Sequence, residues 1–209
     1  GEHDQILKRT MYEPSVHEPL IITGPDVSKG NSVETPVSLI DIFPTLMDMA
    51  EVETDYDLDG ESLMPVLRNE ESNRRDWVFS EYHGDRCNTG AFMLRKDEWK
   101  YIHYVGYEPL LFNLEEDPWE INNLAGEKPK VVAKFKDLLN DIVDVEEVDR
   151  RAKKYDKEHF RKWRKEHLQK GDYDKIMATV YSGFDGLAIE DIISWRDEDE
   201  KQIKEWLEE

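Results

Sequence analysis

Residues 1–22 read GEHDQILKRTMYEPSVHEPLII, and this stretch decides how the sequence around it is interpreted. It opens with polar and charged residues, passes Lys8 and ends in the apolar run at 20–22. A surface loop has this composition where it enters a buried strand. We therefore predict a strand near residues 20–23. Because ligands bind at strand ends in open α/β sheets, Lys8 near the end of this strand is predicted to contact an anion. A solvated loop lysine fits the same pattern.

Four segments of the chain resemble landmarks of the formylglycine-dependent sulfatases. Residues 1–22 are similar to the part of those enzymes that follows their Asp-His or Asp-Asn metal-ligand pair. The later segments are SLIDIFPTL at 38–46, LDGESLMPVL at 58–67 and LFNLEEDPWEINNLA at 111–125, in the order that the family has them. The resemblance is greatest to choline-sulfatase-like and arylsulfatase-like enzymes of the alkaline-phosphatase-like superfamily.

The resemblance implies an activity and its limits. It implies that the chain is the C-terminal portion of a sulfatase, a sulfuric ester hydrolase, and is inactive by itself. The nucleophile, which is a formylglycine, and the divalent metal, expected to be calcium, would belong to a missing N-terminal part, with no metal ligands in this fragment. Two alternatives stay open: a phosphodiesterase or phosphonate monoester hydrolase of the same superfamily, and a non-catalytic binding or assembly module.

The family motif assigns candidate site residues. Lys8 matches a lysine that bridges the sulfate and the nucleophile, and we expect Tyr12 and Glu13 to orient its loop. His3 matches a histidine that either contacts substrate or braces the loop. Three further candidates for the substrate pocket lie at strand ends or on a hairpin, and they fit equally well as buried, hydrogen-bonded polar aromatics: Tyr82, His83 and His103.

The resemblance and the periodicity together predict an α/β fold of three parts. Residues 1–75 form the C-terminal edge of a sulfatase-type α/β sandwich. Residues 76–144 form a small antiparallel sheet with a packing helix, and residues 145–209 a charged amphipathic helical tail. Residues 76–144 are expected to form an α+β unit, with a helix from Pro129 and strands at 77–83, 91–95, 99–104 and 110–114.

Three local features are predicted for the connections. A helix starts near Ser38, with Ser38 and Asp41 at capping-box spacing, and its apolar stripe should lie against a sheet. Asp59 is expected to cap the next short helix. The segment from Asp117 is expected to form one helical turn.

Charge and composition limit the classes of partner that the chain can have. The chain has 209 residues, a net charge of −20 and a pI near 4.7, which argues against nucleic acid as a partner. No segment reaches the ~20 apolar residues that span a bilayer, so no membrane partner is expected. The single cysteine, Cys87, excludes an internal disulfide. The expected partners are a sulfate ester of a small molecule or sugar and, through the helical tail, a second copy of the chain.

Overall fold

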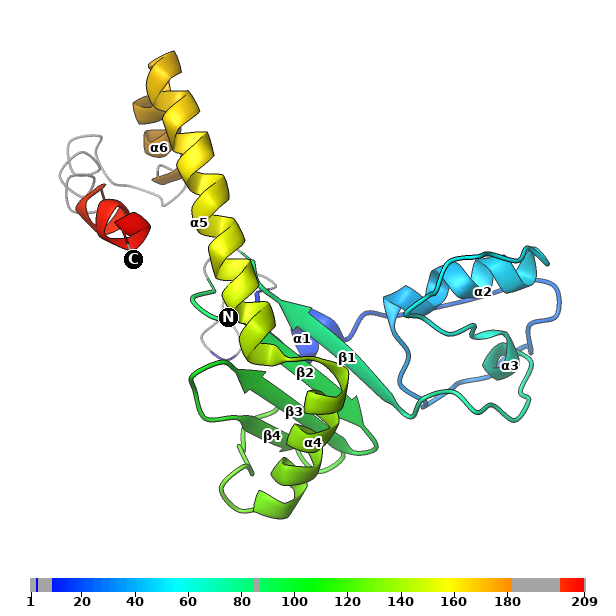
Figure 1. The fold of residues 1–209 in the computed structure, drawn as a ribbon. Coiled ribbons are helices and arrows are strands. Elements are labelled where there is room, and N and C mark those ends of the chain that lie inside the picture. Colours follow the sequence, from blue (N-terminus) through cyan, green and yellow to red (C-terminus); the bar gives the residue numbers. More distant parts are fainter. Residues whose placement is uncertain (1–2, 4–8, 85–86, 182–199, 209) are drawn as a thin grey trace. The chain divides into compact units, whose positions relative to one another are not determined.

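The computed structural model describes residues 3, 9–84, 87–181 and 200–208, with the backbone alone for 178–181 (Figure 1). The chain divides into two compact units, Gly1–Asp149 and Arg150–Glu209. The helices and strands confirm the mixed α/β class that was predicted, with an antiparallel sheet in the first unit.

A four-stranded antiparallel sheet is the centre of the first unit. Its strands follow one another in space as they do in the chain, in the order β1-β2-β3-β4 (Figure 1). Asp97 and Glu98 alone separate β2 from β3, and Asp97 has a φ of 50°, as a tight hairpin turn requires. The strands are β1 (Trp77–Tyr82), β2 (Ala91–Lys96), β3 (Trp99–Tyr104) and β4 (Leu110–Asn113).

The two faces of the sheet bury different partners, because successive side chains of a strand point to opposite sides. On the first, which we call the helix face, Phe92, Leu94 and Tyr101 pack against Phe135 and Leu139 of α4 (Pro129–Ile142) (Figure 1). The second, which we call the loop face, carries Ala91, Met93, Ile102 and Phe112, and Met11 packs on it. Sheet and helix were both predicted.

Residues 38–68 form a small helical region with a polar centre. It contains the 3-10 turn Leu39–Asp41, α2 (Ile42–Met49) and α3 (Met64–Leu67). The capping box is confirmed, because the Ser38 N–H donates to Asp41 at 2.9 Å. Asp41 is 1% exposed and is paired with Arg74 at 2.7 Å.

The predicted packing of this helix is wrong for the part of the chain that the structure describes. Phe43 and Leu46, from the expected apolar stripe, are 53% and 56% exposed. Both faces of the sheet are already occupied, one by α4 and the other by Met11 and its neighbours. The sheet therefore has no face left for α2.

Three further expectations about connections are wrong. Residues 20–23 form no strand, and Ile21 is 87% exposed, since a strand needs a neighbour for its backbone groups. Asp59 does not cap α3, whose N-cap is Leu63. The segment after Asp117 forms turns, because the Asn113 and Asp117 side chains accept hydrogen bonds from backbone N–H groups that a helix would use differently.

The second unit is helical where the structure describes it. It holds most of α5 (Val145–Lys170), α6 (Tyr173–Tyr181) and a helical segment at 200–208. Gly171 ends α5 with a φ of 73°, in the left-handed region that glycine adopts without strain. An aromatic cluster of Phe160, Trp163, Tyr173 and Trp206 joins these helices.

Candidate functional site

Residues 9–16 lie on the loop face of the sheet, directly after the predicted catalytic lysine. Met11 is 2% exposed and packs among Met93, Ile102 and Phe112. The one-turn helix α1 (Glu13–Val16) follows, with Pro14 in its first turn, a position where the missing N–H of proline costs nothing. The segment is therefore fixed to the sheet by a buried apolar side chain and ends in a preorganised turn.

A buried lysine ties the same segment to the sheet electrostatically. Lys100 of β3 is 0% exposed, and its Nζ lies 2.9 Å from Glu13 Oε1 and 2.8 Å from Glu120 Oε1. Glu120 Oε2 also accepts a 2.7 Å hydrogen bond from the Glu13 backbone N–H. A buried charge is tolerated only when it is paired, and here one ammonium group pairs with two carboxylates.

Glu120 occupies an uncommon backbone conformation. Its φ is 54°, in the left-handed region that non-glycine residues rarely adopt, and the residue is 2% exposed. Such a conformation persists only where its surroundings hold it, and it is common at functional sites. The contacts of the Glu120 carboxylate with Lys100 and with the Glu13 N–H stabilise this conformation.

Tyrosine and histidine rings extend the cluster. The ring of His3 stacks on Tyr12 with 3.9 Å between centroids and 4° between planes. Burial raises the pKa of Tyr12, and the Glu120 carboxylate raises it further. Burial, with nearby Tyr12, raises the pKa of Tyr104 to about 12. Both hydroxyls therefore stay protonated at neutral pH and can donate hydrogen bonds to an anion.

The structure brings some of the predicted site residues together and separates others. His3 and Tyr82 belong to the surroundings of the loop face, His3 by its stacking on Tyr12 and Tyr82 by its packing there. His103 projects to the helix face, where it stacks on Tyr101 with 6.5 Å between centroids. Lys8 lies outside the described residues, and its role stays a prediction.

His83 follows β1 and also turns toward the helix face. Its ring meets the ring of Phe92 edge-on at 5.2 Å. Both ring nitrogens of His83 and Nε2 of His103 are buried without a hydrogen-bond partner among the described residues. Burial lowers the pKa of His103, so its imidazole favours the neutral form. These two histidines thus lie on the opposite side of the sheet from Lys100, and the structure supports no shared pocket with it.

Sequence reasoning named Glu13 and Tyr12 as groups that orient the Lys8 loop, which stays a prediction, and it missed Lys100 and Glu120. The signal for Lys100 was present: a lysine stands among the apolar and aromatic residues of the strand WKYIHY. A lysine at such a position is almost never fully buried unless it is paired. The partner that it needed lay far away in the sequence.

The described residues hold no group of three or more His, Cys, Asp or Glu side chains placed to bind a metal ion. In the same described residues no helix combines the length and the apolar composition that crossing a bilayer requires. What this region offers chemically is a rigidly anchored loop with protonated tyrosines beside it.

Comparison with known proteins gives this geometry its context. Residues 1–147 match the family model described as N-sulphoglucosamine sulphohydrolase, C-terminal. Arylsulfatase K of Danio rerio is 40% identical over 214 residues, covering 99% of this chain and 39% of the relative, so the chain spans well under half of that protein.

Two solved structures with the same fold are also similar. A 2-O GAG sulfatase has a TM-score of 0.55 and 30% identity, over 62% of this chain and 30% of that one. The phosphonate monoester hydrolase of Silicibacter pomeroyi has a TM-score of 0.55 and 26% identity, over 63% of this chain and 29% of that one. With the family model matching most of its length, the chain belongs to the sulfatase family and corresponds to the C-terminal domain of such proteins.

Proposed function

We propose that this chain serves, within a longer protein, in the hydrolysis of sulfate esters of carbohydrates or other small molecules. The observation that carries the proposal is the anchoring of residues 9–16 by Met11 and by the Lys100–Glu13–Glu120 cluster, in a chain that belongs to the sulfatase family. A segment held this firmly suits the placement of a catalytic group directly before it, since small displacements of such groups are costly.

Lys8 is the group that we assign to the chemistry. Its ammonium would lie against the sulfuryl oxygens, where negative charge increases as the ester bond breaks. His3 would either contact the substrate or brace the loop through Tyr12, on which its ring stacks. Tyr82 and the two histidines His83 and His103 stay predicted wall residues; of these, only Tyr82 packs on the loop face.

Sulfatases generally use a formylglycine and a divalent metal ion. As the resemblance to the family implies, we assign calcium and the formylglycine to a part of the longer protein other than these residues. When bound, the ion would supply positive charge at the sulfuryl oxygens. Self-association through the helical tail also stays a prediction.

A related phosphonate monoester hydrolase activity is the second candidate. The observation that favours it is the TM-score of 0.55 to the Silicibacter pomeroyi enzyme, equal to that of the 2-O GAG sulfatase. Sulfate and phosphonate monoesters are similar in shape and charge, so an anchored lysine suits both. A non-catalytic binding or assembly module is the third candidate, and the basic helix of the second unit is its structural basis.

The experiment uses a longer polypeptide that contains these 209 residues and the N-terminal region that full-length relatives have. Hydrolysis of p-nitrophenyl sulfate and of p-nitrophenyl phenylphosphonate is measured for the unmodified protein, for Lys8→Ala and for the control Lys29→Ala, which changes an exposed turn lysine. We expect Lys8→Ala to lower kcat about 10²- to 10³-fold, as removal of a single oxyanion donor does, with the control unchanged.

The outcomes separate the three candidates. Faster hydrolysis of the sulfate supports the sulfatase proposal, and faster hydrolysis of the phosphonate moves the assignment to the second candidate. Equal turnover of Lys8→Ala and the unmodified protein would remove Lys8 from the site and favour the binding module.

A further inference from the structure

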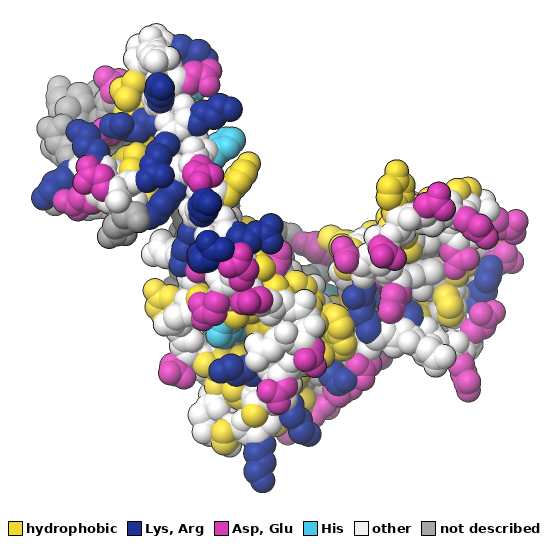
Figure 2. Space-filling model, viewed as in Figure 1, with side chains coloured by type: hydrophobic (Ala, Val, Ile, Leu, Met, Phe, Trp, Pro, Cys, Tyr) yellow, Lys and Arg dark blue, Asp and Glu magenta, His cyan; other side chains and the backbone are white. Residues whose placement is uncertain are grey.

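A strongly basic helix stands in a strongly acidic chain. Residues 150–170 of α5 carry ten Lys or Arg residues against three Asp or Glu, a net charge of +7, whereas the whole chain has −20. Figure 2 shows Lys and Arg side chains gathered along this helix. Solvated helices commonly balance their charges in pairs four residues apart, and an excess of this size requires another explanation.

Five of these cations form a continuous line, which we call the basic stripe. The first four follow one another at spacings of three or four residues, and the fifth, Lys165, lies four residues after Arg161, so all five lie on one side of the helix. The stripe is about 17 Å long at 1.5 Å per residue, which suits a ligand with repeated negative charges better than a single anion. It consists of Lys154, Lys157, Arg161, Arg164 and Lys165.

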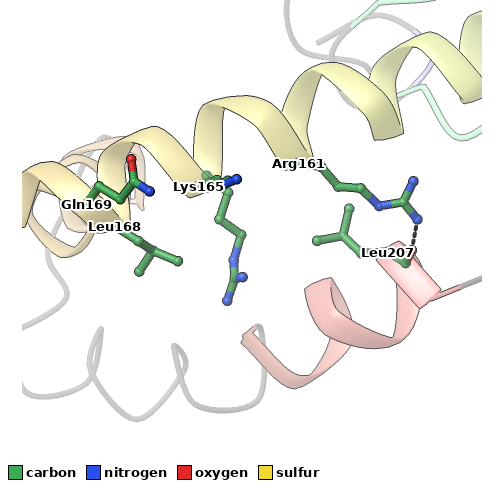
Figure 3. Close-up of a pocket in the computed structure, with 6 residues that line it drawn as sticks. Arg161, Lys165, Leu168, Gln169 and Leu207 are labelled. Atoms are coloured by element: carbon green, nitrogen blue, oxygen red, sulfur yellow. Dashed lines mark hydrogen bonds between the residues drawn. The ribbon is translucent and has the colours of Figure 1, made fainter.

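Neighbouring groups hold the stripe in place and leave much of its charge uncompensated. Lys157 lies over the ring of Trp206 at 5.6 Å, and Arg161 donates to the backbone oxygen of Leu207 (Figure 3). Neither partner carries a negative charge. Arg164 does pair with Glu200, and the exposed pair of Lys154 with Glu158 at 3.8 Å contributes little.

A pocket opens on the same side of the helix. Its volume is about 390 Å³, within the range of small-ligand sites, and Arg161, Arg164, Lys165 and Gln169 line it together with Leu168 and Leu207 (Figure 3). Arg161, Lys165 and the Gln169 amide give it donors, while Arg164 is already paired with Glu200, so the pocket suits one anionic group of a longer ligand.

We propose that the basic stripe of α5 is a binding site for sulfated polysaccharide. The stripe supplies the positive charge, and its pocket receives one sulfate-bearing unit. The choice of sulfated polysaccharide over nucleic acid rests on the proposed function, because a sulfatase that acts on carbohydrate meets this polyanion as substrate. Bound in this way, a polymeric substrate would stay near the protein between successive reactions.

The test measures binding without hydrolysis. A fluorescent heparin octasaccharide is titrated with the 209-residue chain, and anisotropy is recorded between 50 and 300 mM NaCl. The variant Lys154→Gln, Arg161→Gln, Lys165→Gln is compared with the control Arg151→Gln, Lys162→Gln, Lys170→Gln. Both triples remove two lysines and one arginine from exposed positions of α5, and each breaks one exposed ion pair.

We expect the affinity of the stripe variant for heparin to be lower than that of the control by a factor of about ten or more. The slope of log affinity against log salt concentration should be smaller in magnitude by about two to three. Circular dichroism checks that the helix is retained, and Lys154→Gln with Lys165→Gln, which leaves the Arg161 contact intact, gives a second reading. Equal weakening in both triples, or no binding by the unmodified chain, would overturn the proposal. So would tighter binding of a DNA duplex of equal charge, which would assign the stripe to nucleic acid.

Failure of this proposal is distinguishable from failure of the proposed function. Binding of heparin through the stripe needs no turnover, and hydrolysis of p-nitrophenyl sulfate needs no stripe. Each experiment therefore decides one claim.

Discussion

Replacing Lys100 by Met tests whether the buried cluster holds the site segment. Methionine keeps the length of the side chain and removes its charge, which leaves Glu13 and Glu120 facing each other without a cation. Lys100 is 0% exposed and the Glu120 side chain 1%, so water cannot take over the lost pairing of Glu120, whereas the Glu13 side chain is 25% exposed. Breaking a buried ion pair by removing one partner costs about 3 to 5 kcal/mol, and we expect a loss in this range in the free energy of unfolding at pH 7.5.

A matched control exists on the neighbouring strand. Lys96 of β2 lies 2.7 Å from Asp76, a distance like that of the buried pair, but the two side chains are 34% and 65% exposed. Lys96→Met should therefore cost about 0 to 1 kcal/mol. The comparison keeps the substitution the same and the distance similar, and it changes the burial and the number of paired carboxylates, which is two for Lys100 and one for Lys96.

The assay is urea unfolding of the chain, read by hydrogen exchange of peptides from β2 and β3, so that opening of the sheet is measured separately from the helical tail. A double variant, Lys100→Met with Glu120→Gln, removes the carboxylate charge that the single variant leaves buried, and it should recover part of the loss. The reasoning is refuted if Lys100→Met costs no more than Lys96→Met, or if the double variant is as unstable as the single one.

Two more predictions concern packing and pH. Gly60→Ala should lower the free energy of unfolding by about 2 kcal/mol or more, because an added Cβ would lie 2.1 Å from the Ile40 carbonyl oxygen. Gly126→Ala is the control and should be tolerated, because a Cβ added there would have no atom within 4 Å. Equal urea midpoints for the two variants would contradict this prediction. Burial lowers the pKa of His103 in the folded chain, so the unfolded chain binds the proton more readily, and stability should fall as pH drops below the ordinary value of about 6.5. His103→Gln should lose this dependence between pH 7.5 and 5.5, while the exposed His159→Gln keeps it; a parallel decline in both variants would argue against His103 as the source.

The sheet and its helix could be predicted because their information is local. The strands alternate between two faces, a two-residue turn joins the hairpin at Asp97, and Pro129 marks the start of α4. The capping box at Ser38 and Asp41 was likewise predictable, since its two residues are three positions apart. Periodicities and short spacings of this kind can be recognised in a sequence without knowledge of the tertiary structure.

The failed expectations share a cause, which is dependence on a neighbour. The apolar run at 20–22 has the composition of a buried strand, and Phe43 and Leu46 have the spacing of a buried helix face, yet Ile21, Phe43 and Leu46 are exposed in this chain. A strand or an amphipathic helix needs a partner to bury it, and composition alone does not name that partner. These surfaces are consistent with our proposal that the chain works within a longer protein.

The anchoring cluster was beyond sequence reasoning for a related reason. Lys100 and Glu13 are 87 positions apart, and the backbone of Glu13 meets Glu120 across 107 positions. No local pattern links such residues, and the chain offers 48 acidic residues as possible partners for one lysine. The apolar surroundings of Lys100 predict that it is paired, and only the fold selects Glu13 and Glu120. Those two carboxylates belong to the segment after Lys8 and to the strained loop at 120. If Lys8 has the role that we propose for it, a substitution at Lys100 should lower turnover as well as the stability of the sheet, because the anchoring of the segment after Lys8 is lost.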